Sequence, residues 1–151
     1  MSEATEKPVY RVPFVERTGM RKLEEKRGYS KLLMPLEQNA NHVSVMYMGA
    51  FTVLAEAAAA GPGISILDTA KYFPIIKDIY VDFHRMAASD VTAEYSLSDA
   101  QIDALLSDLE AKGRATYVAD IPMLDRQGSL VATGKVTVKL LSHDWPPKDA
   151  G

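Results

Sequence analysis

One carboxylate stands alone in the most apolar stretch of this sequence. Residues 43–60 read VSVMYMGAFTVLAEAAAA, and Glu56 is the only charged residue among them. A carboxylate in apolar surroundings loses hydration, which partners or a ligand must replace. Because desolvation also raises the pKa of such a group toward neutrality, Glu56 is a candidate general base. The alternative is a partly exposed glutamate that only favours helix formation among the alanines.

Two small residues accompany Glu56 on the predicted helix. Gly49 and Thr52 precede it at a spacing that places all three close to one helical face. Small side chains at these positions leave room for a ligand or for a second chain. A polar loop, residues 37–42, precedes the helix, and we expect Asn39 or Asn41 to cap the helix N-terminus.

The composition narrows the class of protein. The chain has 151 residues, a formal net charge of -3 and no cysteine. Without a strong basic patch, a nucleic-acid partner is not expected. Without cysteine the chain can form neither disulfides nor thiolate metal sites, which suits a cytoplasmic location. The N-terminus shows no apolar signal segment, and residues 43–60 are shorter than a membrane span and contain Glu56, so no membrane insertion is expected.

The order of the predicted elements indicates the fold. We expect a helix over residues 12–26, and we expect the apolar helix of residues 43–60 to end at Gly61-Pro62-Gly63. Ser98 and Gln101 form a capping box for an amphipathic helix that ends at Gly113. Strands are expected at residues 29–36, 73–85, 91–97, 114–124 and 130–141. Together these predict an α+β fold in which a curved antiparallel β-sheet wraps around a long central α-helix.

Three groups of residues, taken together, resemble a known family. They are Asn41-His42, Gly49-Ala50 and Glu56; the strand and turn IYVDFHRMAASDVTAEYSL; and the hairpin DRQGSLVATGKVTVKLL. In this order they resemble the hotdog-fold thioesterases, most closely those of the phenylacetate-pathway type and their relatives. The resemblance covers roughly residues 29–141. We therefore expect a hotdog domain at residues 29–142, preceded by an N-terminal tail and helix packed on it at residues 1–28 and followed by a flexible tail at residues 143–151.

The sequence departs from this family at two places. Phenylacetate-type enzymes carry a histidine followed by two glycines at the start of the central helix. The corresponding residues here are Tyr47-Met48-Gly49-Ala50, so the histidine is absent. The helix that begins after Ser98 is an extra helix between two strands, where many members have a tight turn. It could cover the mouth of a pocket or form a subunit contact.

The resemblance implies an enzyme that hydrolyses an acyl thioester of coenzyme A or of acyl carrier protein, with no cofactor or metal. Glu56 would act as general base or nucleophile, and backbone N–H groups near Gly49 would hold the developing oxyanion. The family also implies a homodimer or a dimer of dimers, in which Asn41 or His42 of one chain lies near Glu56 of the other. Residues expected to bind the substrate are Met48, Ala50 and Thr52, with Arg85 and Lys135 as contacts for the coenzyme A phosphates.

Two other functions fit the same residues. His42 and Glu56 lie fourteen positions apart, a separation comparable to that of the catalytic pair in hydroxyacyl dehydratases of this fold. The H-F-P and M-P-G motifs of those dehydratases do not occur in the sequence. The third function is a non-catalytic acyl-CoA-binding hotdog protein, which the missing helix-start histidine supports. Asp82 and His84 share a strand face, but two possible ligands without a third do not predict a metal site.

Overall fold

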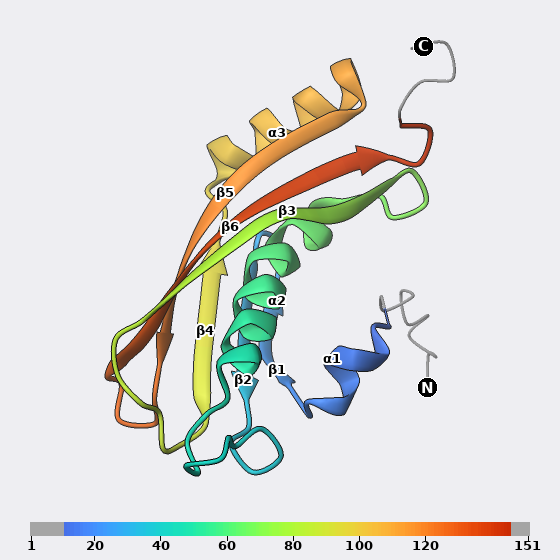
Figure 1. Cartoon of the computed structure of the whole chain (residues 1–151). Helices are drawn as coiled ribbons and strands as arrows, with labels where there is room; N and C mark the ends of the chain where they lie inside the picture. Colours follow the sequence, from blue (N-terminus) through green and yellow to red (C-terminus); the bar gives the residue numbers. More distant parts are fainter. Residues whose placement is uncertain (1–10, 146–151) are drawn as a thin grey trace, which may run out of the picture.

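The computed structural model describes residues 11–145, which form one sheet and three helices. The elements in chain order are α1 (Pro13–Arg17), β1 (Arg21–Lys26), β2 (Tyr29–Met34), α2 (Met48–Ile66), β3 (Tyr72–Phe83), β4 (Val91–Ser96), α3 (Asp99–Lys112), β5 (Arg114–Leu124) and β6 (Leu130–Ser142). The strands pair antiparallel in the order β1-β2-β4-β5-β6-β3. Figure 1 shows this sheet curving around α2. The predicted α+β hotdog arrangement, with α3 as the extra helix, is confirmed.

Small residues allow the sheet to close tightly on α2. Leu54, Ala55 and Ala58 are fully buried. A Cβ atom on Gly134 of β6 would come within 2.9 Å of the Ala55 Cβ, so only glycine permits this close approach. By length and composition α2 could also cross a membrane, but 61% of its apolar window is buried inside the protein, which is expected of a core helix.

The predicted end of the central helix at Gly61-Pro62-Gly63 is wrong, because α2 continues through this tripeptide to Ile66. A proline inside a helix cannot donate a hydrogen bond to the carbonyl four residues before it. Here that carbonyl belongs to Ala58, and the Ser30 hydroxyl of β2 donates to it over 3.4 Å. A neighbouring strand therefore replaces the donor that Pro62 lacks.

A tyrosine from β5 supports the same turn of α2. The Tyr117 hydroxyl donates to the Ala59 carbonyl (2.6 Å) and accepts from the Gly63 N–H group (3.2 Å). It thereby stands between two groups that a regular helix would join directly. Burial raises the pKa of Tyr117, so its hydroxyl remains a donor at neutral pH. The C-terminal half of α2 thus depends on side chains that are distant in the sequence.

The N-terminal segment is not the single helix expected over residues 12–26. α1 ends at Arg17, and Gly19 then adopts a positive φ of 73°. The following residues, Arg21–Lys26, pair with β2 as the edge strand β1. Hydrogen bonding to a neighbouring strand outweighs the weak helical periodicity of this segment. The expected boundary between the N-terminal segment and the hotdog domain, at residue 28, falls in the turn between β1 and β2. β1 therefore belongs to the same sheet as the hotdog domain.

The later elements follow the predicted pattern. The strands β3 to β6 occupy the expected segments, and α3 begins with the expected capping box. In this box the Gln101 N–H group donates to the Ser98 hydroxyl (3.1 Å), and the Ser98 N–H group donates to the Gln101 side-chain oxygen (2.9 Å). The buried side of α3, formed by Ile102, Leu105 and Leu109, packs mainly on β5. α3 therefore belongs to the core of the fold and does not line the pocket described below.

The expected flexible tail begins in contact with the rest of the protein. The His143 N–H group donates to the Lys71 carbonyl (3.0 Å), and the Arg114 guanidinium lies over the Trp145 ring. The remainder of this tail, residues 146–151, and the N-terminal residues 1–10 lie outside the described part of the chain.

Candidate active site

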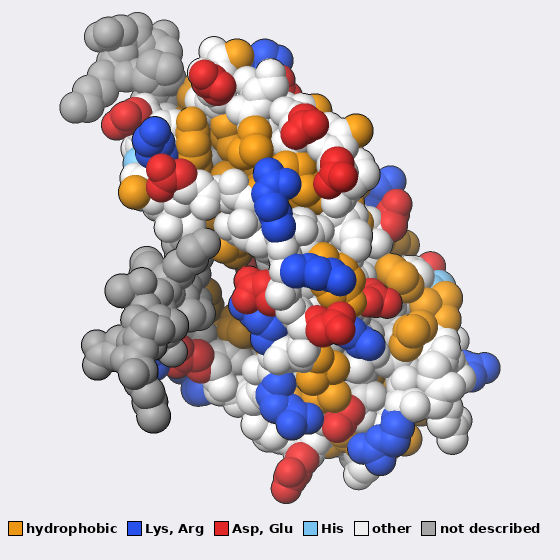
Figure 2. All heavy atoms as spheres, turned by 180° about the vertical axis from the view of Figure 1, so that it is seen from behind, with side chains coloured by type: hydrophobic (Ala, Val, Ile, Leu, Met, Phe, Trp, Pro, Cys, Tyr) orange, Lys and Arg blue, Asp and Glu red, His pale blue; other side chains and the backbone are white. Residues whose placement is uncertain are grey.

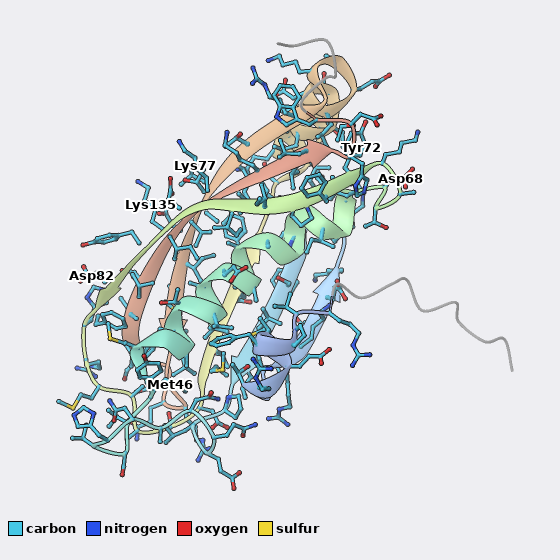
Figure 3. All side chains as sticks on the ribbon, turned by 45° about the vertical axis from the view of Figure 1, so that its right-hand side comes forward. Met46, Asp68, Tyr72, Lys77, Asp82 and Lys135 are labelled. Carbon is cyan, nitrogen blue, oxygen red and sulfur yellow. The ribbon has the colours of Figure 1, made fainter. Side chains whose placement is uncertain are left out.

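A pocket of about 380 Å³ opens at the N-terminal end of α2. The loop before α2, the first turn of α2 and the segment that follows β3 form its walls. Most of its lining is apolar, with polar side chains from Asn41, His42, His84 and Arg85. Figure 3 shows Met46, one of the lining residues, beside this end of α2. Phe51 and Phe83 join α2 to β3 in the pocket wall, with an edge-to-face contact and ring centroids 5.5 Å apart.

The Asn41 side chain organises the loop that precedes α2. Its Oδ1 atom accepts hydrogen bonds from the N–H groups of Val43 (2.9 Å) and Val45 (3.2 Å). The Asn41 amide nitrogen has no partner among residues 11–145, and the residue lines the pocket. Asn41 does not cap the helix as expected, because the N-cap residue is Tyr47, whose side chain makes no capping hydrogen bond.

Asn39, the other residue expected to cap α2, instead joins separate segments of the chain through hydrogen bonds. Its amide nitrogen donates to the Thr18 carbonyl (2.7 Å) and to the Pro35 carbonyl (2.8 Å). Its own carbonyl accepts from the Tyr47 N–H group over 2.8 Å. Asn39 therefore ties the start of α2 to the chain near α1 and to the end of β2.

The start of α2 presents free backbone donors. The N–H groups of Met48 and Gly49 have no acceptor in the part of the chain that the structure describes. The first turn also contains no acidic residue. Unpaired N–H groups at a helix start carry partial positive charge, so this end of α2 favours a ligand atom with negative charge. Of the neighbouring predicted contacts, Met48 is exposed and Ala50 is buried.

Glu56 lies two turns further along α2. Gly49, Thr52 and Glu56 are each half-buried, and the helix places them on one face as predicted. Burial raises the pKa of Glu56, and its carboxylate has no hydrogen-bond or ion-pair partner among the described residues. The Thr52 hydroxyl is engaged with the Met48 carbonyl (3.4 Å). A helix rises about 1.5 Å per residue, which separates Glu56 from Gly49 by roughly 10 Å along the axis. Neither of them is among the residues that line the pocket.

The basic side chains expected near the substrate divide into two groups. His42 and Arg85 line the pocket with their side chains exposed, and Arg85 forms no ion pair within residues 11–145. Lys135 is exposed between buried neighbours of β6, and Figure 3 shows it pointing away from α2. The structure thus brings Arg85 to the pocket and leaves Lys135 on the other face of the sheet. In the view from behind, basic and acidic side chains are interspersed (Figure 2).

Several pocket residues were not expected from the sequence. His84, Met86 and Ala87 enter the lining from the turn after β3, and the His84 Nε2 atom lies 3.0 Å from the Thr133 hydroxyl. Their local sequence carries no signal for this position, because it depends on how β3 folds back beside α2. Among the described residues no group of three or more potential metal ligands occurs. The start of α2 therefore combines an apolar hollow with free N–H donors. An unpartnered carboxylate lies two turns further along the same helix, outside the pocket lining.

Known proteins share this arrangement of strands and helices. A family model described as a domain of unknown function (DUF4442) matches residues 9–140. No curated protein matches the chain. A solved structure from Pseudomonas aeruginosa, described as a protein of unknown function and probable thioesterase, shares 33% sequence identity with a TM-score of 0.81. That match covers 87% of this chain and 89% of the other.

Two more distant structures carry the name thioesterase. One from Staphylococcus aureus has 20% identity and a TM-score of 0.69, covering 85% of this chain and 98% of that one. Structures of this staphylococcal protein exist with a glutamine and, separately, a glutamate replaced by alanine. One from Haemophilus influenzae has 16% identity and a TM-score of 0.66, covering 85% of this chain and 82% of that one. This chain therefore belongs to the DUF4442 family and has the hotdog fold of the thioesterases to which it is similar.

Proposed function

We propose that this protein is an acyl-CoA thioesterase in which Glu56 activates the attacking water. One observation carries the proposal: a single helix holds both a half-buried carboxylate without a partner and a start with free N–H groups at Met48 and Gly49. Thioester hydrolysis needs a base for the water and donors for the oxyanion. In this proposal the base of one copy of the chain and the N–H donors of a second copy act on the same carbonyl. Similarity to proteins named thioesterases supports the same reaction.

The reaction proceeds through these groups. The Glu56 carboxylate takes a proton from a water molecule, whose oxygen bonds to the carbonyl carbon of the thioester. The electron pair of the C=O double bond moves to oxygen, and the N–H groups of Met48 and Gly49 from a second copy of the chain donate to this oxyanion. When the C=O bond re-forms, the C–S bond breaks and the thiolate takes the proton from Glu56. The products are a carboxylic acid and the free thiol of coenzyme A.

Asn41 is the candidate for positioning the attacking water. Hydrogen bonds in the loop fix its side-chain oxygen and leave its amide nitrogen available at the pocket. Fifteen positions separate Asn41 from Glu56, and fifteen positions also separate the substituted glutamine and glutamate of the staphylococcal thioesterase. Asparagine and glutamine both end in a carboxamide, whose N–H groups can donate to a water oxygen.

In this proposal a second copy of the chain completes the site. β3 is an edge strand of the sheet, and an edge strand can pair with another chain through its free backbone groups. Large apolar side chains are exposed on this strand at Ile75 and Tyr80. Pairing of two copies would bring Asn41 or His42 of one chain toward Glu56 of the other. Sedimentation equilibrium should then report a dimer or tetramer, and a monomer at assay concentrations would contradict this arrangement.

In this proposal the part of the substrate that carries the thiol binds beside Arg85, at the edge of the pocket. Arg85 has no carboxylate partner in the described chain, and its guanidinium can bind a phosphate group through charge-assisted hydrogen bonds. Both coenzyme A and acyl carrier protein present their thiol on a phosphopantetheine arm. Parallel assays with the same acyl group on the two carriers distinguish them, and faster turnover of the acyl carrier protein ester would correct our choice of coenzyme A.

Thiol release from acyl-CoA substrates tests the proposal. The substrates should include short, medium, long and aromatic acyl groups. Glu56→Gln keeps the size of the side chain and removes the base, so kcat should fall about 10²- to 10⁴-fold. The matched control is Glu110→Gln, which changes an exposed glutamate on α3 and should retain wild-type turnover.

Three results would overturn this assignment. Wild-type turnover by Glu56→Gln would remove Glu56 from the mechanism. Binding of acyl-CoA by the folded wild type without release of thiol would select the non-catalytic binding protein. Hydration of an enoyl-CoA that is lost in His42→Ala would select the dehydratase.

A further inference from the structure

The ring of Tyr47 covers the start of α2. A Cβ atom on Gly49 would come within 2.5 Å of the Tyr47 Cε1 atom and 3.1 Å of its Cδ1 atom. The edge of the ring therefore fills the space that a glycine leaves open. This space adjoins the free N–H groups of Met48 and Gly49, which the thioester carbonyl must reach in the proposed reaction.

Few contacts restrain this ring. The backbone of Tyr47 is fixed, because its N–H group donates to Asn39 (2.8 Å) and its carbonyl accepts from Ala50 (3.0 Å). Tyr47 as a whole residue is 55% exposed, and its hydroxyl has no hydrogen-bond partner among residues 11–145. Rotation about χ1 can therefore carry the ring to another staggered position without disturbing the helix.

An apolar surface is available to receive the displaced ring. Tyr47 lines the pocket together with Met48, Phe51 and Phe83. Aromatic rings offer a large contact area, and methionine side chains adapt their shape to what they contact. A ring that leaves Gly49 can therefore pack along an apolar group that enters the pocket.

We infer that Tyr47 is a substrate-positioning residue whose ring and the thioester carbonyl occupy the space beside Gly49 in turn. Once displaced, the ring packs on the acyl group, which should accordingly be apolar. The inference rests on the proposed function and adds a residue to it. It also gives Gly49 two tasks, since the glycine admits the ring in the free protein and the carbonyl in the complex.

A double-mutant cycle over Tyr47 and Gly49 tests the inference, with the acyl-CoA that the wild type hydrolyses best. Tyr47→Ala removes the contact with the acyl group, so KM should rise about tenfold or more while kcat changes less. Tyr47→Phe keeps the ring and should recover most of this loss. Gly49→Ala should lower kcat in both the wild-type and the Tyr47→Ala backgrounds, because its methyl group blocks the carbonyl whether or not the ring is present.

The control for these variants is Leu23→Ala, which truncates an exposed side chain on β1, away from the pocket. Thermal unfolding of each variant separates a kinetic change from a loss of fold. An unchanged KM in Tyr47→Ala would overturn the inference. So would a Gly49→Ala substitution without effect in the Tyr47→Ala background, because the glycine would then serve only the ring. Failure of the wild type to release thiol would instead overturn the proposed function itself.

Discussion

The two ends of α2 differ in how their backbone polar groups are satisfied. At the C-terminal end, side chains from the surrounding fold bond to the helix where proline interrupts it: Ser30 donates to Ala58, and Tyr117 joins Gly63 to Ala59. At the N-terminal end, the first N–H groups have no side-chain cap and no acceptor within the described chain. We call the C-terminal end of α2 the closed end, because side chains of the fold bond to its backbone groups. We call the N-terminal end the open end, because its first N–H groups have no partner in the described chain.

The surroundings of the two ends differ in the same way. Near the open end, five large apolar side chains are exposed: Val43, Tyr47, Met48, Phe83 and Met86. Near the closed end, Pro62 and Gly63 are buried and Tyr117 is almost fully so. Folding alone gains nothing from free donors beside exposed apolar side chains, whereas a ligand with an acyl group and a carbonyl oxygen would use both. The contrast supports the proposal that the open end serves binding and chemistry, whereas the closed end serves stability.

The largest change in activity is expected for Asn41→Asp at the open end of α2. The new carboxylate can still accept from the N–H groups of Val43 and Val45, but it lacks the amide donor that faces the pocket. We expect kcat to fall about 10²- to 10³-fold, as for the loss of one oriented donor, with little change in melting temperature.

The matched change is Asn39→Asp in the neighbouring structural position. It removes the donor to Thr18 and Pro35 and should reduce the free energy of unfolding by about 1–3 kcal/mol. The kcat of the folded fraction should stay at the wild-type value. If Asn41→Asp kept full activity, or lost stability as Asn39→Asp does, Asn41 would have only a structural role, as Asn39 does.

A smaller and opposite effect is expected at the closed end of α2. Tyr117→Phe removes the hydroxyl that bonds to Gly63 and Ala59, so two buried backbone groups each lose a hydrogen bond. Such a loss reduces the free energy of unfolding by about 1–3 kcal/mol, which urea denaturation can measure. Thiol release by the folded variant should match the wild type. Reduced turnover at unchanged stability would show that the closed end takes part in the chemistry.

The smallest effect concerns the ionisation of Glu56. Burial raises its pKa in the folded protein above the value in the unfolded chain, so folding favours the protonated form. That contribution to stability is complete below the unfolded pKa, about 4.3 for glutamate, and disappears as the pH rises through the folded pKa. Since glutamine does not ionise, Glu56→Gln should gain stability relative to wild type between about pH 4 and pH 7. Urea unfolding can measure the free energies of unfolding of both proteins across this range. If the advantage of Glu56→Gln over wild type shrank as the pH rose, the burial of Glu56 would be contradicted.

Local signals in the sequence predicted much of the fold. The capping box at Ser98 and Gln101, the left-handed glycine at position 113 and the apolar run around Glu56 each depend on residues close in the chain. Predictions failed where distant residues decide the outcome. Gly61-Pro62-Gly63 is a sequence that commonly ends a helix, but α2 continues through it, and Ser30 and Tyr117 bond to its backbone there from two strands.

The site shows the same division between local and distant effects. The face shared by Gly49, Thr52 and Glu56 follows from helical periodicity alone. The positions of Arg85 and Lys135 do not, because successive residues of a strand point to opposite faces of a sheet. Only the sheet register shows that Lys135 lies on the other face, and only the fold brings the turn after β3 beside the start of α2.

Backbone amide NMR can show whether a ligand binds at the open end of α2. A suitable probe is an acyl-CoA analogue in which a methylene group separates the sulfur from the carbonyl, since this bond resists hydrolysis. We predict that saturating probe shifts the amide resonances of Met48 and Gly49 strongly and those of Gly61 and Gly63 little. Binding that leaves Met48 and Gly49 unshifted, or that shifts the closed end instead, would contradict the account.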